Sequence, residues 1–88
     1  MLTKTFTITS PIGLHARPAA ILVSLAGGYQ SSITMKYHEK IVPLSSLIAV
    51  MTLGVEAGKN VEISISGTDQ AEAMERLEQF FEKELKDL

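Results

Sequence analysis

The sequence predicts a two-layer α/β sandwich with strands and helices in the order βαββαβα. Three observations predict it: short segments in which apolar and polar residues alternate, apolar stretches that end at glycine, and a final segment with apolar residues every three or four positions. Alternating strands form a sheet with one covered face, and amphipathic helices can cover that face. With 88 residues the chain has room for one core, so residues 1–88 are expected to form a single domain.

The first strand is expected over residues 2–9, where threonines alternate with apolar residues and Lys4 is the one exception. A helix is expected over 18–26. Proline is accepted only in the first turn of a helix, so Pro18 places the helix start within a few residues, and Gly27 ends the helix.

A β-hairpin is expected next, with strands at 33–37 and 40–42 and a turn near His38. Pro43 has no amide hydrogen to donate and limits further pairing. The third strand is therefore expected at an edge of the sheet.

A helix of about two turns is expected over 47–53, with Ser46 as its capping residue. The fourth strand, over 60–67, has the clearest alternation. In the final helix Asp69 is expected to cap the first turn, with Glu72 completing a variant of the capping box. The core face of this helix is expected to carry Met74, Leu77, Phe81, Leu85 and Leu88.

Composition excludes several classes of protein. The absence of cysteine excludes disulfides, zinc–thiolate sites and cysteine nucleophiles. A net charge of −2 without a cluster of lysine or arginine argues against nucleic acid as a direct partner. No apolar run approaches the roughly 20 residues of a membrane span, and no signal peptide is recognisable. We therefore expect a soluble, cytoplasmic protein without membrane insertion, metal or cofactor.

His15 is expected at or just before the start of the first helix, where the amides of Ala16 and Arg17 have no helical acceptor. Such amides bind anions, and Arg17 adds a forked cation suited to phosphate. The helix dipole and Arg17 both favour a neutral, nucleophilic imidazole. This pattern predicts phosphoryl chemistry at His15, with the phosphoryl group bound only weakly. Weak binding suits a carrier. The alternative is a polar residue beside a helix and a solvated surface arginine.

Residues 13–19, GLHARPA, resemble the signature of HPr, the family of histidine-containing phosphocarriers of the bacterial phosphoenolpyruvate-dependent phosphotransferase system. The chain length, the order of elements and the segment 46–54 are similar too. The resemblance implies an α+β open-faced β-sandwich, four antiparallel strands covered on one face by three helices. It also implies that His15 accepts a phosphoryl group on Nδ1 from phosphorylated enzyme I, with Arg17 steadying it, and passes it to a IIA domain of a sugar transport system. The protein would be a substrate of phosphotransferases and no enzyme itself.

Ser46 matches the regulatory serine of the family. In many Gram-positive bacteria this serine is phosphorylated by HPr kinase/phosphorylase, which impairs transfer from enzyme I and promotes binding to a catabolite-control repressor. A simple helix cap is the alternative.

The resemblance further implies a partner surface on the first two helices, formed by Ala20, Leu47, Ile48 and Met51. A two-turn helix that is apolar nearly all round cannot bury every side chain, so part of this set is expected to be exposed; in the alternative, all are core.

The chain departs from the family at Gly27 and Gly28, where HPr proteins often carry basic or polar residues near the partner interface, and also at Ile12, Pro43, Ser45 and Ala49. We therefore expect weaker electrostatic steering toward acidic partners. The alternative function is a regulatory module of the Crh type, acting through phospho-Ser46 and a catabolite-control transcription factor, although that branch typically lacks the histidine. A third alternative is a small ligand-binding or structural domain of ferredoxin-like type. A carrier that shuttles between partners is most simply a monomer.

Overall fold

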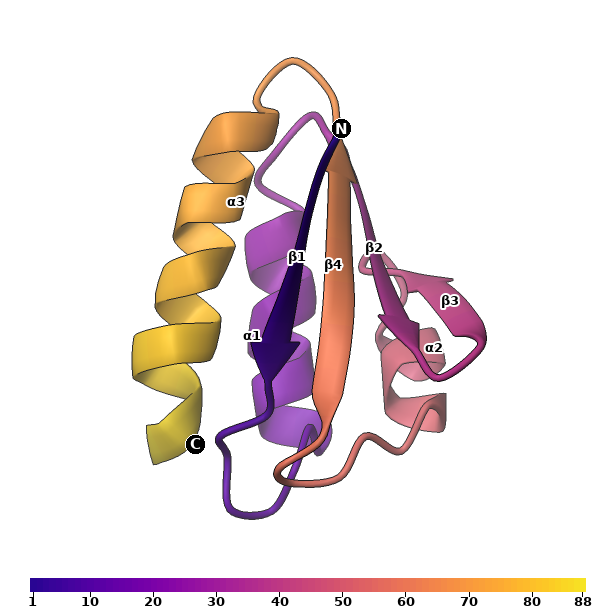
Figure 1. Ribbon diagram of the computed structural model, residues 1–88, viewed down its shortest axis with the longest axis vertical. Helices are drawn as coiled ribbons and strands as arrows, with labels where there is room; N and C mark the ends of the chain where they lie inside the picture. The colour runs from indigo at the N-terminus through magenta and orange to yellow at the C-terminus, as the bar shows by residue number, and fades with distance from the viewer.

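A computed structural model describes residues 1–88 as a four-stranded antiparallel sheet with helices packed against one face (Figure 1). The strands are β1 (Leu2–Thr7), β2 (Ser32–Tyr37), β3 (Lys40–Pro43) and β4 (Asn60–Ser66). The helices are α1 (Ala16–Ala26), α2 (Leu47–Thr52) and α3 (Gln70–Gln79), which continues through a π-helical turn, η1 (Phe80–Glu84), into a final 3₁₀ turn, η2 (Leu85–Asp87). The order βαββαβα and the open-faced sandwich are confirmed. None of these helices combines the length and the apolar character that crossing a membrane requires.

The sheet has the strand order β1-β4-β2-β3, so β4 lies between the first two strands of the chain. Alternation sets the two faces of the sheet. In the covered row Met35 of β2 pairs with Ile63 of β4 and with Val42 of β3, and all three side chains are withdrawn from water to some degree. β3 lies at an edge of the sheet, as Pro43 predicts, but the strand extends one residue further than expected and includes Pro43, which pairs with Thr34.

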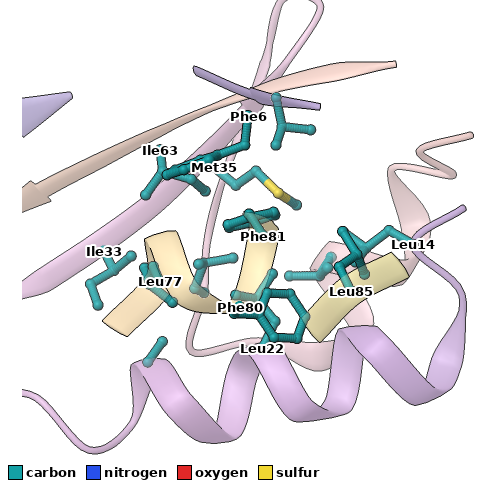
Figure 2. Packing of buried hydrophobic residues seen from close by; sticks show 14 of the residues in the cluster. Phe6, Leu14, Leu22, Ile33, Met35, Ile63, Leu77, Phe80, Phe81 and Leu85 are labelled. Carbon is teal, nitrogen blue, oxygen red and sulfur yellow. The ribbon is translucent and has the colours of Figure 1, made fainter. Parts of the chain in front are cut away.

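Three phenylalanines lie at the centre of the core between the sheet and α3 (Figure 2). The ring of Phe81 stacks on Phe6 of β1 at a centroid distance of 4.5 Å, and Phe80 meets Phe81 edge-on at 5.2 Å. Phe80 lies outside the set that the helical spacing predicted, yet it is fully buried. In the π-helical turn the amide of Leu85 donates to the carbonyl of Phe80, five residues back.

Lys4, the exception in the alternation of β1, reaches over the edge of the core to α3. Its ammonium group forms an ion pair with Glu78, lies 3.3 Å from Glu82 and sits 5.4 Å from the centroid of the Phe6 ring. The hydrogen bond to Glu78 is the main cause of the raised pKa of Lys4. The polar head is thereby satisfied although the strand face is apolar.

Several sequence predictions about the ends of elements need correction. α1 begins at Ala16, two residues before the predicted start, because Pro18 lies within the first turn and not at its beginning. β1 ends at Thr7 because Ile8 bonds instead to the loop before β4, donating to Lys59 at 2.8 Å and accepting from Gly58 at 2.9 Å. Asp69 stands at the start of α3 but makes no capping bond with its side chain, because its carboxylate is engaged by the segment that leads into β2.

Candidate functional site

His15 is the residue immediately before α1, and its extended backbone (φ −80°, ψ −172°) leads the chain into the helix. The approach to it is fixed by two neighbours. Gly13 has a φ of +87°, which only glycine adopts readily. Leu14 is buried and donates its amide to the carbonyl of Val55 at 2.9 Å. The loop before α1 is thus held against the loop between α2 and β4, at the lower end of the molecule in Figure 1.

Free backbone donors lie directly after His15. The first helical hydrogen bond runs from the amide of Ala19 to the carbonyl of His15 at 3.0 Å. The amides of Ala16 and Arg17 precede that bond, and Pro18 has no amide hydrogen. The early start of α1 therefore leaves two donors at the positive end of an 11-residue helix, as the sequence predicts for an anion site.

The imidazole of His15 is half-buried. Nε2 is buried without a hydrogen-bond partner, and the side chain makes no capping bond to the helix. Of the two ring nitrogens, Nε2 alone is both buried and unpartnered. The guanidinium of Arg17 is exposed and takes part in none of the ion pairs of the chain, so its donors are available to an anion.

A shallow hollow brings the start of α1 together with the end of α2. We call it the His15 hollow; it is lined by Ile12, Leu14, His15, Ala16, Met51, Gly54, Val55 and Glu56. It unites three of the predicted site residues, His15, Ala16 and Met51. Arg17 and Ala20 lie outside this lining. Sequence reasoning missed Glu56, because nothing in the sequence indicates that the loop after α2 meets the loop before α1.

The predicted partner surface is exposed where the sequence placed it. Ile48 is 79% exposed, Met51 43% and Leu47 36%, and Ala20 on α1 is exposed as well. Val50 is the one fully buried residue of α2. The alternative in which all of these side chains belong to the core is therefore wrong. The helices α1 and α2 pack against each other, so these side chains lie on neighbouring helices.

Ser46 caps α2. Its hydroxyl accepts a hydrogen bond from the amide of Ala49 at 3.2 Å, and its carbonyl accepts from Val50 at 3.1 Å. Ser46 lies at the opposite end of this six-residue helix from the His15 hollow and is absent from the lining of that hollow.

The second histidine lies elsewhere. His38 is exposed in the turn between β2 and β3, with a φ of 55° and its ring 4.1 Å from that of Tyr37. No group of three or more histidine, cysteine, aspartate or glutamate side chains is arranged to hold a metal ion.

The family described as "PTS HPr component phosphorylation site" matches residues 2–83. Among solved structures, HPr-C-His from Thermoanaerobacter tengcongensis is 35% identical with a TM-score of 0.92, covering 100% of this chain and 98% of its own. Phosphocarrier protein HPr from Bacillus anthracis is 30% identical (TM-score 0.86; coverage 92% and 96%). The catabolite repression protein Crh of Bacillus subtilis is 31% identical (TM-score 0.74; coverage 96% and 97%), and its structure is described as a dimer with a swapping domain.

Proposed function

Since the chain belongs to the HPr family of the phosphotransferase system, we propose that it is a phosphocarrier that accepts a phosphoryl group on His15 from phosphorylated enzyme I and passes it to IIA domains of sugar transport systems. One observation carries the proposal: an imidazole with its Nε2 enclosed stands beside two free helix amides and an unpaired arginine. Residues 1–88 act as one carrier domain, which is a substrate of phosphotransferases and catalyses no reaction itself.

The chemical step is a displacement at phosphorus. Nδ1 of His15 attacks the phosphoryl group as the P–N bond to the donor histidine breaks, and the donor imidazole leaves with the bonding pair. The amides of Ala16 and Arg17 and the Arg17 guanidinium then hold the phosphoryl oxygens. The helix end contributes roughly 0.3–1 kcal/mol and a charge-assisted bond roughly 1.5–3 kcal/mol. Each additional ~1.4 kcal/mol of stabilisation of the bound phosphoryl group would slow its onward transfer about tenfold. Weak binding therefore favours a carrier.

The partner surface in this proposal is formed by Ala20, Leu47, Ile48 and Met51. Their exposure on two packed helices next to the His15 hollow supports it, because exposed apolar side chains in one region favour docking. The proposed carrier is cytoplasmic, and works as a monomer because it must present the same face to successive partners. It needs no cofactor.

The test is incubation of the protein with phosphoenolpyruvate and the enzyme I of the same bacterium. We expect an acid-labile phosphoryl adduct that His15→Ala abolishes. His38→Ala is the matched control, since His38 is an exposed histidine far from the site in the sequence and is expected to leave the label unchanged. Label that survives His15→Ala would contradict the proposal.

A regulatory role of the Crh type is the second candidate, favoured by the 31% identity to Crh and by the capping geometry of Ser46. HPr kinase/phosphorylase would modify this hydroxyl, and a catabolite-control repressor would bind the product. A phosphate at the start of α2 is electrostatically compatible with the helix. Acid-stable label that appears only with ATP and kinase, and is lost in Ser46→Ala, would support this candidate over the carrier.

A further inference from the structure

Glu56 is the acidic residue of the His15 hollow, and its place there is set by the backbone. Its loop is tied to the loop before α1 by the hydrogen bond from Leu14 to Val55. Gly13 packs so closely on this loop that a Cβ built on it would lie 3.1 Å from the Cα of Glu56. The carboxylate therefore belongs to a loop that is fixed beside the phosphoryl acceptor.

No ion pair balances the charge of Glu56, although Lys59 lies three residues further along the same loop and donates its amide to the carbonyl of Glu56 at 3.3 Å. Its side chain is exposed, makes no hydrogen bond and takes part in none of the ion pairs. Apart from Glu56 and His15, the residues that line the hollow carry no titratable group. The helices α1 and α2 contain a single charged residue, Arg17, which lies outside that lining. A phosphoryl group on His15 would therefore share the hollow with the negative charge of Glu56, which no other lining residue compensates.

We propose that Glu56 is a specificity-determining residue for phosphoryl transfer, selecting partners that present a lysine or arginine opposite the His15 hollow. The inference rests on the proposed function. Without a partner, the carboxylate repels an approaching phosphoryl donor. A partner with a cation at this place gains an attractive pair with Glu56 and also neutralises the phosphoryl charge, whereas a partner with a neutral or acidic surface there meets only repulsion.

Two phosphoryl donors distinguish the repulsion of a small anion by Glu56 from the attraction of a docked partner. The anion of potassium phosphoramidate is small and has no docking surface. Nδ1 of His15 attacks its phosphorus and the P–N bond breaks. The phosphoramidate nitrogen gains a proton and leaves with the bonding pair as ammonia. Phosphorylated enzyme I transfers by the analogous displacement from its histidine, but docks first. The initial rate of adduct formation is measured for the wild type and for Glu56→Gln with each donor, at low and at about 1 M salt.

The matched control is Glu75→Gln, which removes the same charge from α3. Glu75 is exposed and unpaired, and it lines a different hollow together with Tyr29, beyond the far end of α1 from His15. We expect Glu56→Gln to react about two- to threefold faster with phosphoramidate and several-fold slower with enzyme I at low salt. Both differences should nearly vanish at 1 M salt, where the screening length is about 3 Å. Glu75→Gln should match the wild type with both donors.

The sign of the enzyme I result decides the proposal. If Glu56→Gln accepts from enzyme I as fast as the wild type or faster, or if Glu75→Gln shows the same changes, the selective role of Glu56 is wrong while the carrier function stands. If the wild type reacts with phosphoramidate but never with enzyme I, the carrier function itself fails, and partner selection by Glu56 fails with it.

Discussion

Ser31 donates two hydrogen bonds to one carboxylate oxygen of Asp69, from its amide at 3.0 Å and from its hydroxyl at 2.5 Å. The other carboxylate oxygen accepts from the amide of Gln30 at 2.8 Å. Asp69 thereby joins the turn before α3 to the segment that enters β2. The hydroxyl of Ser31, followed by the amide of Gln30, holds the pKa of the Asp69 carboxyl below its ordinary value of 3.8.

Asp69→Asn is expected to lower the thermal unfolding midpoint at neutral pH, because the charged acceptor of these bonds is lost. A carboxyl whose pKa is lowered by folding stabilises the protein fully above its ordinary value of 3.8, and this contribution disappears as the pH falls through the lower pKa of the folded state. The gap between wild type and variant, followed by circular dichroism melts across pH, should therefore close in acid. Asp87→Asn, the same change at an exposed position, serves as the control; a gap that stays constant down to pH 2 would contradict the assignment.

Gly13→Ala is expected to destabilise the protein and to disturb His15. Gly13 and Gly58 have similar φ angles, +87° and +82°, so alanine costs roughly 1–2 kcal/mol of backbone strain at either position. At Gly13 the new Cβ would also lie 2.7 Å from the carbonyl oxygen of Val55, whereas at Gly58 nothing lies within 4 Å. In urea unfolding we expect Gly13→Ala to lose about 1–3 kcal/mol more than Gly58→Ala. It should also slow phosphorylation of His15; equal losses in the two variants would rule out the close contact.

Replacement of Ser46 should separate capping from charge. Ser46→Ala removes the acceptor of the Ala49 amide and should lower the free energy of unfolding by about 0.5–2 kcal/mol. Ser46→Asp keeps an acceptor and adds negative charge at the favourable end of α2, so we expect it to fall within about 0.5 kcal/mol of the wild type. Urea unfolding checks both values. An aspartate variant as unstable as the alanine variant would show that α2 does not accommodate a charge there.

The features that were predictable from sequence are those with a local signal. Alternation identified β1, β2 and β4, the turn after β2 indicated β3, and Pro18 placed the start of α1 to within a few residues. Ser46 could be identified as a cap because its hydrogen-bond partner, the amide of Ala49, lies only three residues further along the chain. Exposure of Ile48 followed from the composition of a short helix that cannot bury every side. Each of these properties is decided within a few residues of chain.

What the sequence could not supply depends on segments that meet only in the folded protein. Asp69 was expected to cap its own helix, but its carboxylate accepts hydrogen bonds from Ser31, 38 residues away, instead. Glu56 enters the site because its loop packs on Gly13, and no pattern links those two positions. The burial of Phe80 likewise involves a partner outside its own turn, because Phe81, on which it packs edge-on, stacks on Phe6 of β1. Local periodicity carries no information on such pairs.

Phe80→Ala tests the importance of the residue that periodicity missed. The side chain is fully buried and packs edge-on against Phe81, so its truncation should reduce the free energy of unfolding by about 3–5 kcal/mol. Gln79→Ala, at the exposed neighbouring position, should change it by less than about 0.5 kcal/mol. Both are measured by urea unfolding. A loss below about 1 kcal/mol for Phe80→Ala would mean that the ring is not part of the packed core.

Ile48→Ser tests the partner surface without touching the chemistry. Ile48 is 79% exposed, so serine should alter the free energy of unfolding by less than about 0.5 kcal/mol. If this side chain docks partners, transfer from enzyme I to His15 should slow several-fold, while the rate with phosphoramidate, which needs no docking, should be unchanged. Ile41→Ser is the matched control: Ile41 is 63% exposed on the edge strand β3 and belongs to no part of the proposed surface. Equal effects of the two serine variants on transfer from enzyme I would mean that general loss of apolar surface, and not docking through α2, accounts for the result.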